Sequence, residues 1–361
     1  MSDLFQPLDF PHGPAMKNRF MLAPLTNQQS HADGTLSDDE FNWLVMRAKG
    51  GFGLTMTCAA HVQPVGQGFP GQLGIFSDDH LQGLTRLASA IKAEGSLAVV
   101  QLHHAGMRAV KEIVGTPVCP SEDAETGSRA LSTAEVEQLA ADFVTAAVRA
   151  EQAGFDGVEI HGAHGYVLCE FLSPTINRRD DRYGGGLENR ARIIREIIDG
   201  VRASCRKDFH LGLRLSPERF GLELAEIRQL AGEILAEGKI DHLDMSLWDI
   251  FKEPAEEAFK GRSLMSYFTE LDRGAVRLGV AGKIMTAADA RRALDEGADY
   301  VLIGRAAILH HDFPNKVEAD ADFQSAALPV SAAYLQAEGL GPAFVEYMSG
   351  WPGFVAKEAA A

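Results

Sequence analysis

The chain has 361 residues, of which 46% are hydrophobic and 23% charged, so it contains enough apolar material for a sizeable globular core. Its formal net charge of −16 argues against nucleic acid and anionic membranes as partners. The sequence has no apolar run long enough to span a membrane and no secretory-signal pattern at its start, and its four cysteines are scattered without a CxxC spacing. We therefore expect a cytoplasmic protein without a disulfide framework or a cysteine-ligated cluster.

Short apolar segments recur along the chain, separated by stretches rich in Ala, Glu and Lys. Such segments predict parallel strands that are buried on both faces. In chain order they are residues 20–24, 51–58, 96–102, 155–160, 210–215, 240–245, 274–280 and 298–304. Glycines end several of the intervening helical stretches, because glycine adopts the left-handed cap conformation at low steric cost. These glycines are Gly50, Gly51, Gly95, Gly154, Gly238 and Gly297.

Two helix starts can be located from their capping pattern. Ser132 and Glu135 form a capping box, and an apolar stripe at helical spacing follows from Val136 to Val148. Thr286 begins a similar helix.

The alternation of strand and helix about eight times in one chain favours a single (β/α)8 TIM barrel over an open α/β sheet. No linker or change in composition divides the alternation. We expect residues 1–313 to form the barrel, with a lead-in over the first 17 residues. Residues 314–361 are expected to form a C-terminal extension that packs on the barrel or on a neighbouring subunit.

In such a barrel the chemistry lies at the carboxyl ends of the strands. The residues expected there are mostly neutral hydrogen-bonding groups, with no obvious nucleophile, no lysine at a strand end and no carboxylate pair. A hydrolase or a Schiff-base aldolase would need one of those. The set is better suited to holding a planar cofactor and polarising a carbonyl group.

The densest signal is the segment 159–185, in which His161 ends a strand and His164 and Tyr166 follow in a glycine-flanked turn. Two imidazole N–H groups that converge on one oxygen would stabilise negative charge there, and the tyrosine could donate a proton nearby. The alternatives are histidines that simply pack in the core and a zinc-binding pair. The i, i+3 spacing without a third ligand argues against zinc, so no metal is expected.

Two loops near the end of the barrel predict a phosphate site. Gly304 and Arg305 follow an apolar strand, and Gly282 lies in the loop after the preceding strand. Barrels often bind phosphate with these two loops, and a guanidinium group suits that ligand. The alternative is a surface arginine beside a packing glycine. The GxGxxG match at residues 66–71 contains a proline and does not directly follow a strand, so we interpret it as an irregular loop. For His103 and His104, packing and function remain open.

Together these residues resemble the old yellow enzyme family of FMN-dependent ene-reductases. The similarity covers most of the chain, and its most specific part is AGFDGVEIHGAHGYVLCEFLSPTINRRDDRYGG at residues 153–185. The other landmarks are NRFMLAPLT (18–26), VVQLHHAG (99–106), HLGLRLSP (210–217) and ADYVLIGR (298–305).

The resemblance implies a role for each matching position. His161 and His164 would bind the carbonyl oxygen of the substrate, Tyr166 would donate a proton, and Gln28 and Trp248 would contact the substrate. The residues implied in FMN binding are Pro24, Leu25, Thr26, Ala59, Ala60, Gln101, Arg214, Gly282, Gly304 and Arg305.

The implied reaction is ping-pong: NADPH or NADH reduces FMN, which then reduces the C=C bond of a small-molecule α,β-unsaturated carbonyl compound. Some relatives carry cysteine at the position of Thr26, some have tyrosine at that of Gln28, and the usual HAGR reads HAGM here, with Arg108 one position later. The resemblance also implies a homodimer or a higher homo-oligomer.

Two readings from other classes remain. One is a flavin-free isomerase or lyase that acts on a phosphorylated substrate with His161 and His164 as acid–base groups. The other is a non-catalytic barrel that binds flavin or phosphate ligands.

Overall fold

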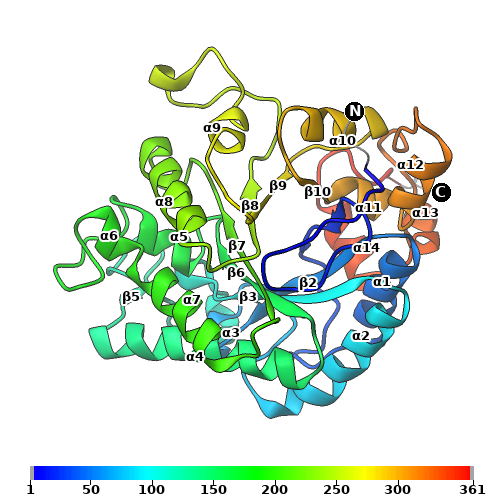
Figure 1. Ribbon diagram of the computed structural model, residues 1–361. Helices are drawn as coiled ribbons and strands as arrows, with labels where there is room; N and C mark the ends of the chain where they lie inside the picture. Colours follow the sequence, from blue (N-terminus) through cyan, green and yellow to red (C-terminus); the bar gives the residue numbers. More distant parts are fainter. Residues whose placement is uncertain (1–3, 358–361) are drawn as a thin grey trace.

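A computed structural model describes residues 4–357, in which eight parallel strands close into a barrel in the order β1-β10-β9-β8-β7-β6-β3-β2 (Figure 1). The (β/α)8 prediction is therefore confirmed. The strands are β1 (Phe20–Leu22), β2 (Leu54–His61), β3 (Leu97–His103), β6 (Gly157–Gly162), β7 (His210–Leu215), β8 (His242–Ser246), β9 (Arg277–Ala281) and β10 (Tyr300–Ile303).

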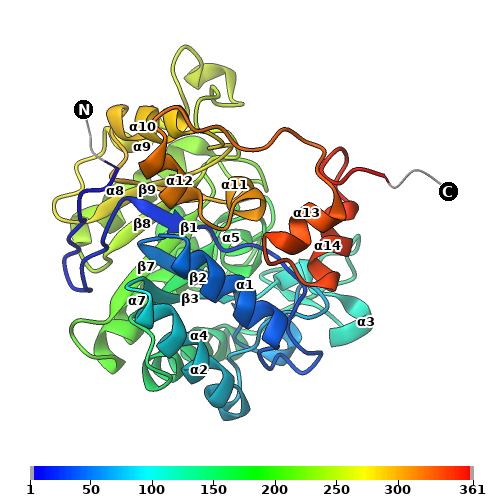
Figure 2. The same cartoon turned by 90° about the vertical axis from the view of Figure 1, so that its right-hand side faces the viewer.

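Helices surround the barrel and cover the outer faces of the strands (Figures 1 and 2). The longer ones are α1 (Asp38–Lys49), α2 (Leu81–Ala93), α4 (Thr133–Gln152), α7 (Arg192–Ser204), α8 (Leu224–Glu237), α10 (Ala287–Asp295) and α14 (Pro342–Ser349). The shorter ones are α3 (Lys111–Val114), α5 (Val167–Leu172), α6 (Leu187–Arg190), α9 (Ser266–Thr269), α11 (Arg305–Leu309), α12 (Phe313–Ala319) and α13 (Ala332–Ala337). Within residues 4–357, no helix combines the length and the apolar character needed to cross a bilayer.

The predicted helix starts are confirmed by reciprocal caps. Ser132 accepts a hydrogen bond from the Glu135 amide while the Glu135 side chain accepts one from the Ser132 amide, and Thr286 and Asp289 repeat the arrangement at α10. Two strands begin three residues later than expected: β9 begins at Arg277 instead of residue 274, and β2 begins at Leu54 instead of residue 51. Gly51 adopts a positive φ of 99° there, so the chain is still turning where the strand was expected. The two-residue strands β4 (Val118–Cys119) and β5 (Arg129–Ala130) were not predicted.

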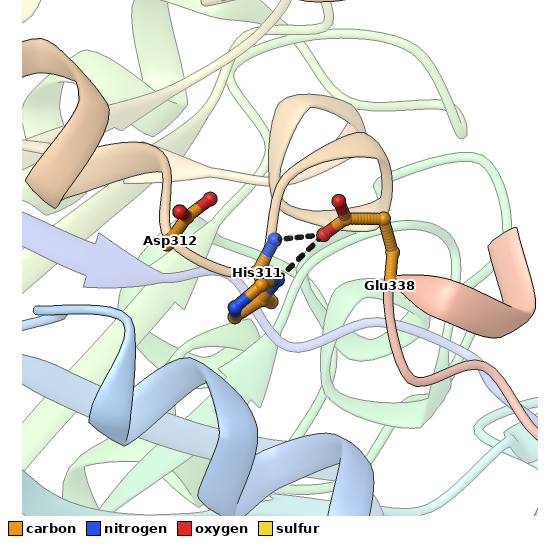
Figure 3. A group of neighbouring side chains, drawn as sticks. All are labelled: His311, Asp312 and Glu338. Carbon is orange, nitrogen blue, oxygen red and sulfur yellow. Dashed lines mark hydrogen bonds and ion pairs between the residues drawn. The ribbon is translucent and has the colours of Figure 1, made fainter. Parts of the chain in front are cut away.

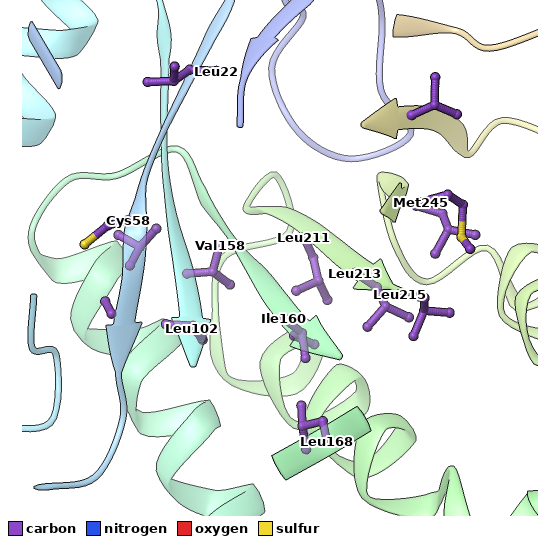
Figure 4. Close-up of a cluster of buried hydrophobic side chains, with 14 of the residues drawn as sticks. Leu22, Cys58, Leu102, Val158, Ile160, Leu168, Leu211, Leu213, Leu215 and Met245 are labelled. Atoms are coloured by element: carbon purple, nitrogen blue, oxygen red, sulfur yellow. The ribbon is translucent and has the colours of Figure 1, made fainter. Parts of the chain in front are cut away.

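Side chains alternate between the two faces of each strand, as the pleat requires. Figure 4 shows Val158 and Ile160 on β6 and Leu213 on β7 within the main hydrophobic cluster of buried side chains. Since His161 lies opposite Arg214 in the register of β6 and β7, these two residues share the other face, which is turned toward the barrel axis.

The lead-in segment closes the amino-terminal end of the barrel. Leu8 pairs with Met16 in an antiparallel bridge, and both pack with interior side chains of the strands. The ring of Phe10 lies 4.5 Å from that of His210, which begins β7. The lead-in therefore covers the interior of the barrel at this end.

The chain after residue 313 contains α12, α13 and α14, and it contacts the barrel (Figure 2). The Phe344 ring lies 4.9 Å from that of Trp43 on α1, and the Tyr334 hydroxyl donates to the Leu309 carbonyl at 2.8 Å. Residues 1–3 and 358–361 lie outside the described residues. The division at residue 313 and the homo-oligomer stay predictions.

An acidic cluster also links α13 to the barrel. Glu338 accepts hydrogen bonds from the amide and the ring Nδ1 of His311, both at 2.7 Å (Figure 3). Asp312 pairs with Lys316 at 2.8 Å. These three groups, His311, Asp312 and Glu338, are close enough to hold a metal ion. Because Glu338 and Asp312 already have partners, and the buried Arg47 adds positive charge nearby, we assign the cluster a structural role.

Candidate active site

A cavity of about 480 Å³ opens at the carboxyl ends of the strands. Its walls come from the segments after β1, β3, β6, β7, β8, β9 and β10, together with α14. The lining residues that matter below are Pro24, Leu25, Thr26, Arg108, His164, Tyr166, Arg214, Arg219, Ser246, Trp248, Gly282, Lys283, Gly304, Arg305, Tyr347 and Trp351.

Backbone strain is concentrated around this cavity. Among the described residues, the non-glycine residues with positive φ are Gln28, His164, Arg219, Phe220, Trp248 and Lys283, and all except Gln28 line the cavity. Each such conformation costs of order 1–3 kcal/mol and persists only where the surrounding structure enforces it. Strain of this kind is typical of functional sites.

The predicted catalytic residues come together beside the cavity. Nδ1 of His164 lies 3.2 Å from Nε2 of His161, and Nε2 of His164 lies 2.6 Å from the Ser246 hydroxyl. The Tyr166 ring lies 5.3 Å from that of His161. At this distance one of the two facing nitrogens donates to the other. A ligand oxygen that accepts from both would replace this hydrogen bond, with each ring carrying its proton on the ligand's side.

The turn that carries these residues is held from three directions. The His164 amide donates to Ser216 at 2.9 Å, and the His164 carbonyl accepts a hydrogen bond from Arg108. Tyr166 is the N-cap residue of α5, and its ring packs against that of His103 at 4.4 Å. His103 is fully buried, so it supports the site by packing and does not line it.

Burial keeps the histidines neutral. It lowers the pKa of both His161 and His164 well below 6.5, and the positive charges of Arg214 and Arg108 lower both values further. Burial raises the pKa of Tyr166, which therefore keeps its phenolic proton. At neutral pH the site therefore contains two neutral imidazole groups and one protonated hydroxyl group. All three can donate hydrogen bonds, and none carries a negative charge that would repel a ligand oxygen.

A buried network lies below the cavity on the inner faces of β3, β6 and β8. Gln101 donates from Nε2 to Glu159 at 2.8 Å, and the other oxygen of Glu159 lies 3.0 Å from Nε2 of His242. Gly212 leaves the space for this histidine, because a Cβ there would lie 2.1 Å from the His242 ring. The side-chain nitrogen of Gln101 is therefore occupied by its hydrogen bond to Glu159, and this bond fixes the orientation of the amide group.

Arg214 is the cationic group at the base of the cavity. Its Nε lies 2.8 Å from Oδ2 of Asp244, although the alignment is too poor for a hydrogen bond. Burial raises the pKa of Asp244 to about 8 against the opposing effect of Arg214. A fixed guanidinium at this position would favour negative charge on the edge of a bound ring.

The phosphate end of the predicted cofactor site is also cationic. Arg305 and Lys283 line it, and Arg305 has no protein acceptor among residues 4–357. Gly304 is open, because a Cβ there would meet nothing closer than 3.6 Å, whereas a Cβ at Gly282 would lie 2.7 Å from the Asp249 amide. An unpaired guanidinium beside an open glycine suits a phosphate, so the residues present fit FMN.

The remaining predicted residues are placed unequally. Pro24, Leu25, Thr26 and Trp248 line the cavity, and Trp248 is 50% exposed. Gln101 and His161 lie just beneath it, and Gln28 is not part of its lining. Ala59 is partly exposed, whereas Ala60 is fully buried in the core between barrel and helices. The side chain of Ala60 lies on the outer face of β2, toward the helices. The prediction that it contacts the cofactor is corrected accordingly.

Several residues that line the cavity were not predicted. Arg219 and Lys283 carry no sequence signal, because L-residues in the left-handed conformation leave no recognisable pattern. Tyr347 on α14 and Trp351 just after it are far away in sequence from the other lining residues. Arg108 was noticed only as a displaced match to HAGR.

The chain is similar in sequence to known proteins. The sequence model of the NADH:flavin oxidoreductase / NADH oxidase family matches residues 3–323. The chain is 37% identical over 327 residues to the probable NADH-dependent flavin oxidoreductase YqiG of Bacillus subtilis (strain 168), covering 87% of each chain. It is 35% identical over 313 residues to an NADPH dehydrogenase of Bacillus pumilus (strain SAFR-032), covering 84% of this chain and 90% of that one.

Solved structures show the same fold. The old yellow enzyme homologue from Zymomonas mobilis superposes with a TM-score of 0.81 at 27% identity, covering 96% of this chain and 99% of that one. Morphinone reductase gives a TM-score of 0.76 at 27% identity, covering 92% of each chain.

The chain therefore belongs to the NADH:flavin oxidoreductase family of old yellow enzyme homologues, whose members depend on FMN and NAD(P)H. It is an NAD(P)H-dependent flavin oxidoreductase, which leaves the flavin-free isomerase or lyase without support.

Proposed function

We propose that this protein binds FMN in the cavity and uses NADPH or NADH to reduce the C=C bond of α,β-unsaturated carbonyl compounds. The observation that carries the proposal is the pair of neutral imidazoles, His161 and His164, whose nitrogens face each other at 3.2 Å at the strand ends. FMN, when bound, would supply the means of passing a hydride from the nicotinamide to the alkene.

The chain's own residues would hold the cofactor at both ends. Arg305 and Gly304 fit the phosphate, and Arg214 fits the edge of the ring system that accumulates negative charge. Thr26 and Gln101 supply polar groups whose positions are set by β1 and by Glu159. These contacts would orient the ring toward the histidine pair.

The histidine pair would bind the carbonyl oxygen of the substrate. As the β-carbon accepts a hydride, electron density moves to that oxygen, and the two N–H groups stabilise it. The Tyr166 hydroxyl would then donate its proton to the α-carbon and regain one from solvent. Overall, one NAD(P)H and one proton convert the alkene to the saturated carbonyl compound.

A steady-state screen tests the proposal. The FMN-loaded protein is assayed anaerobically with cyclohexenone, N-phenylmaleimide and a nitroalkene, each with NADH and with NADPH, and products are identified by mass spectrometry. Saturated products that depend on the nicotinamide support the proposal. A protein that is reduced by NAD(P)H but reduces none of the three alkenes would contradict it.

A further inference from the structure

The charges that line the cavity are all of one sign. Five cationic side chains line it, Arg108, Arg214, Arg219, Lys283 and Arg305, and among the described residues no Asp or Glu does, in a chain with a net charge of −16. A concave surface of one sign attracts ligands of the opposite sign.

Two of these cations have a carboxyl group of the protein beside them. Arg214 faces Asp244, and Lys283 pairs with Asp249 at 3.0 Å. A third, Arg305, belongs to the predicted phosphate site. Arg108 and Arg219 remain, and neither forms an ion pair within residues 4–357.

The position of Arg108 connects it to the reacting end of the cavity. Its guanidinium lies 4.8 Å from the centre of the Tyr166 ring, and it donates a hydrogen bond to the His164 carbonyl. Its charge also lowers the pKa of both His161 and His164. Arg108 therefore keeps guanidinium N–H groups beside His161 and His164. These groups can donate hydrogen bonds to a second polar group of a ligand whose oxygen the two histidines bind.

Arg219 lines the cavity and stacks on the ring of Trp248. Its guanidinium lies 4.7 Å from the centre of the Trp248 ring, and both residues adopt positive φ, 71° and 65°. Its side chain makes no hydrogen bond within the described chain, so the stacking on Trp248 holds it while its N–H groups stay free. Strained backbone at both residues therefore accompanies the position of this cation at the cavity wall.

We infer that Arg108 and Arg219 select substrates that carry a carboxylate in addition to the activated C=C bond. The inference rests on the proposed function and names the substrate class of the same site. The phosphates of NAD(P)H are also anionic, but a ribose separates them from the reacting nicotinamide ring. Arg108 contacts the ring of Tyr166, the proposed proton donor, so it lies close to the reacting atoms of the substrate. The carboxylate would accept hydrogen bonds from the free guanidinium N–H groups.

A pair of substrates that differ in one charge tests the inference. The substrates are 3-oxocyclohex-1-ene-1-carboxylate and its methyl ester, and the quantity is the ratio of their kcat/KM values. Comparing this ratio between wild type and variant cancels the difference in their intrinsic reactivity. We expect Arg108→Gln and Arg219→Gln each to lower the ratio about tenfold, the low end for a charge-assisted hydrogen bond at an exposed site. Lys207→Gln removes one positive charge at the other end of the barrel, before β7, and is expected to leave the ratio unchanged.

Binding is also measured without turnover, so that failure of the proposed reaction does not obscure the result. Calorimetry on the FMN-loaded protein compares 3-oxocyclohexane-1-carboxylate with its methyl ester, and we expect the carboxylate to bind more tightly in wild type and to lose that advantage in both variants. FMN content and thermal unfolding show whether each variant is folded; Arg219→Gln is expected to fold, since its side chain makes no hydrogen bond within the described chain.

Equal ratios in wild type and in both variants would overturn the inference. An effect confined to the KM for NADH or NADPH would also overturn it, because the arginines would then recognise the reductant. Preferential carboxylate binding without alkene turnover would instead contradict the proposed reaction and leave the recognition site intact.

Discussion

Replacing His161 tests whether this residue binds the substrate oxygen or only packs against its neighbours. His161 is 3% exposed, and its ring lies 4.9 Å from that of His164 and 5.3 Å from that of Tyr166. In His161→Ala one of two donors to the substrate oxygen is lost. Loss of one donor of this kind typically costs about 3–4 kcal/mol of transition-state stabilisation, or about a hundredfold to a thousandfold in rate. His161→Asn keeps an N–H donor in a smaller side chain, so its loss is expected to be smaller.

The assay is the anaerobic reaction of the pre-reduced protein with cyclohexenone in a stopped-flow instrument. This step isolates alkene reduction from the reaction with NAD(P)H. His31→Ala, a change at an exposed histidine, is the matched control and is expected to react like wild type. If His161→Ala retains its FMN and reacts with cyclohexenone at the wild-type rate, the predicted role of the histidine pair is wrong.

Three further predictions follow from the same geometry. Arg305→Gln is expected to weaken FMN binding at least tenfold but to leave riboflavin binding unchanged, because only FMN carries the phosphate; fluorescence titration of the apoprotein measures both, and equal losses would contradict the phosphate assignment. Because burial lowers the pKa of His161 and His164 well below 6.5 and raises that of Tyr166, all three keep one protonation state at neutral pH, and the stopped-flow rate should show no step near pH 6.5; a step centred there would argue against this. Glu159→Ala should lower the free energy of unfolding by about 2–4 kcal/mol, because it leaves two buried partners unsatisfied, and a loss below about 0.5 kcal/mol in urea unfolding would contradict the network.

Local signals in the sequence predicted the fold well. Buried parallel strands appear as continuous apolar runs, so all eight barrel strands overlap the expected segments. The capping box at Ser132 lies within four residues and needs no tertiary context. The strands β4 and β5 escaped prediction because two residues are too short to show a period.

The site residues that lie near the ends of strands could be predicted from the sequence. His161, Arg214 and Gln101 were located by counting to the ends of apolar runs. Ala60 shows the limit of this approach: next to Ala59 on β2, it points to the opposite face, and the sequence alone does not tell which alanine faces the ligand.

Residues supplied by tertiary structure could not be predicted. Tyr347 and Trp351 reach the cavity only because α14 packs on α1 through Phe344 and Trp43. The stacking of Arg219 on Trp248 depends on two loops that follow different strands. Such juxtapositions leave no trace in the spacing of residues along the chain.

The visible absorption spectrum of the purified protein tests the central claim most directly, that the cavity at the strand ends binds FMN. We predict a yellow protein with one FMN per chain, whose visible bands bleach on anaerobic addition of NADH or NADPH and return on addition of cyclohexenone. A colourless protein that remains colourless after incubation with FMN and removal of the excess would contradict the claim.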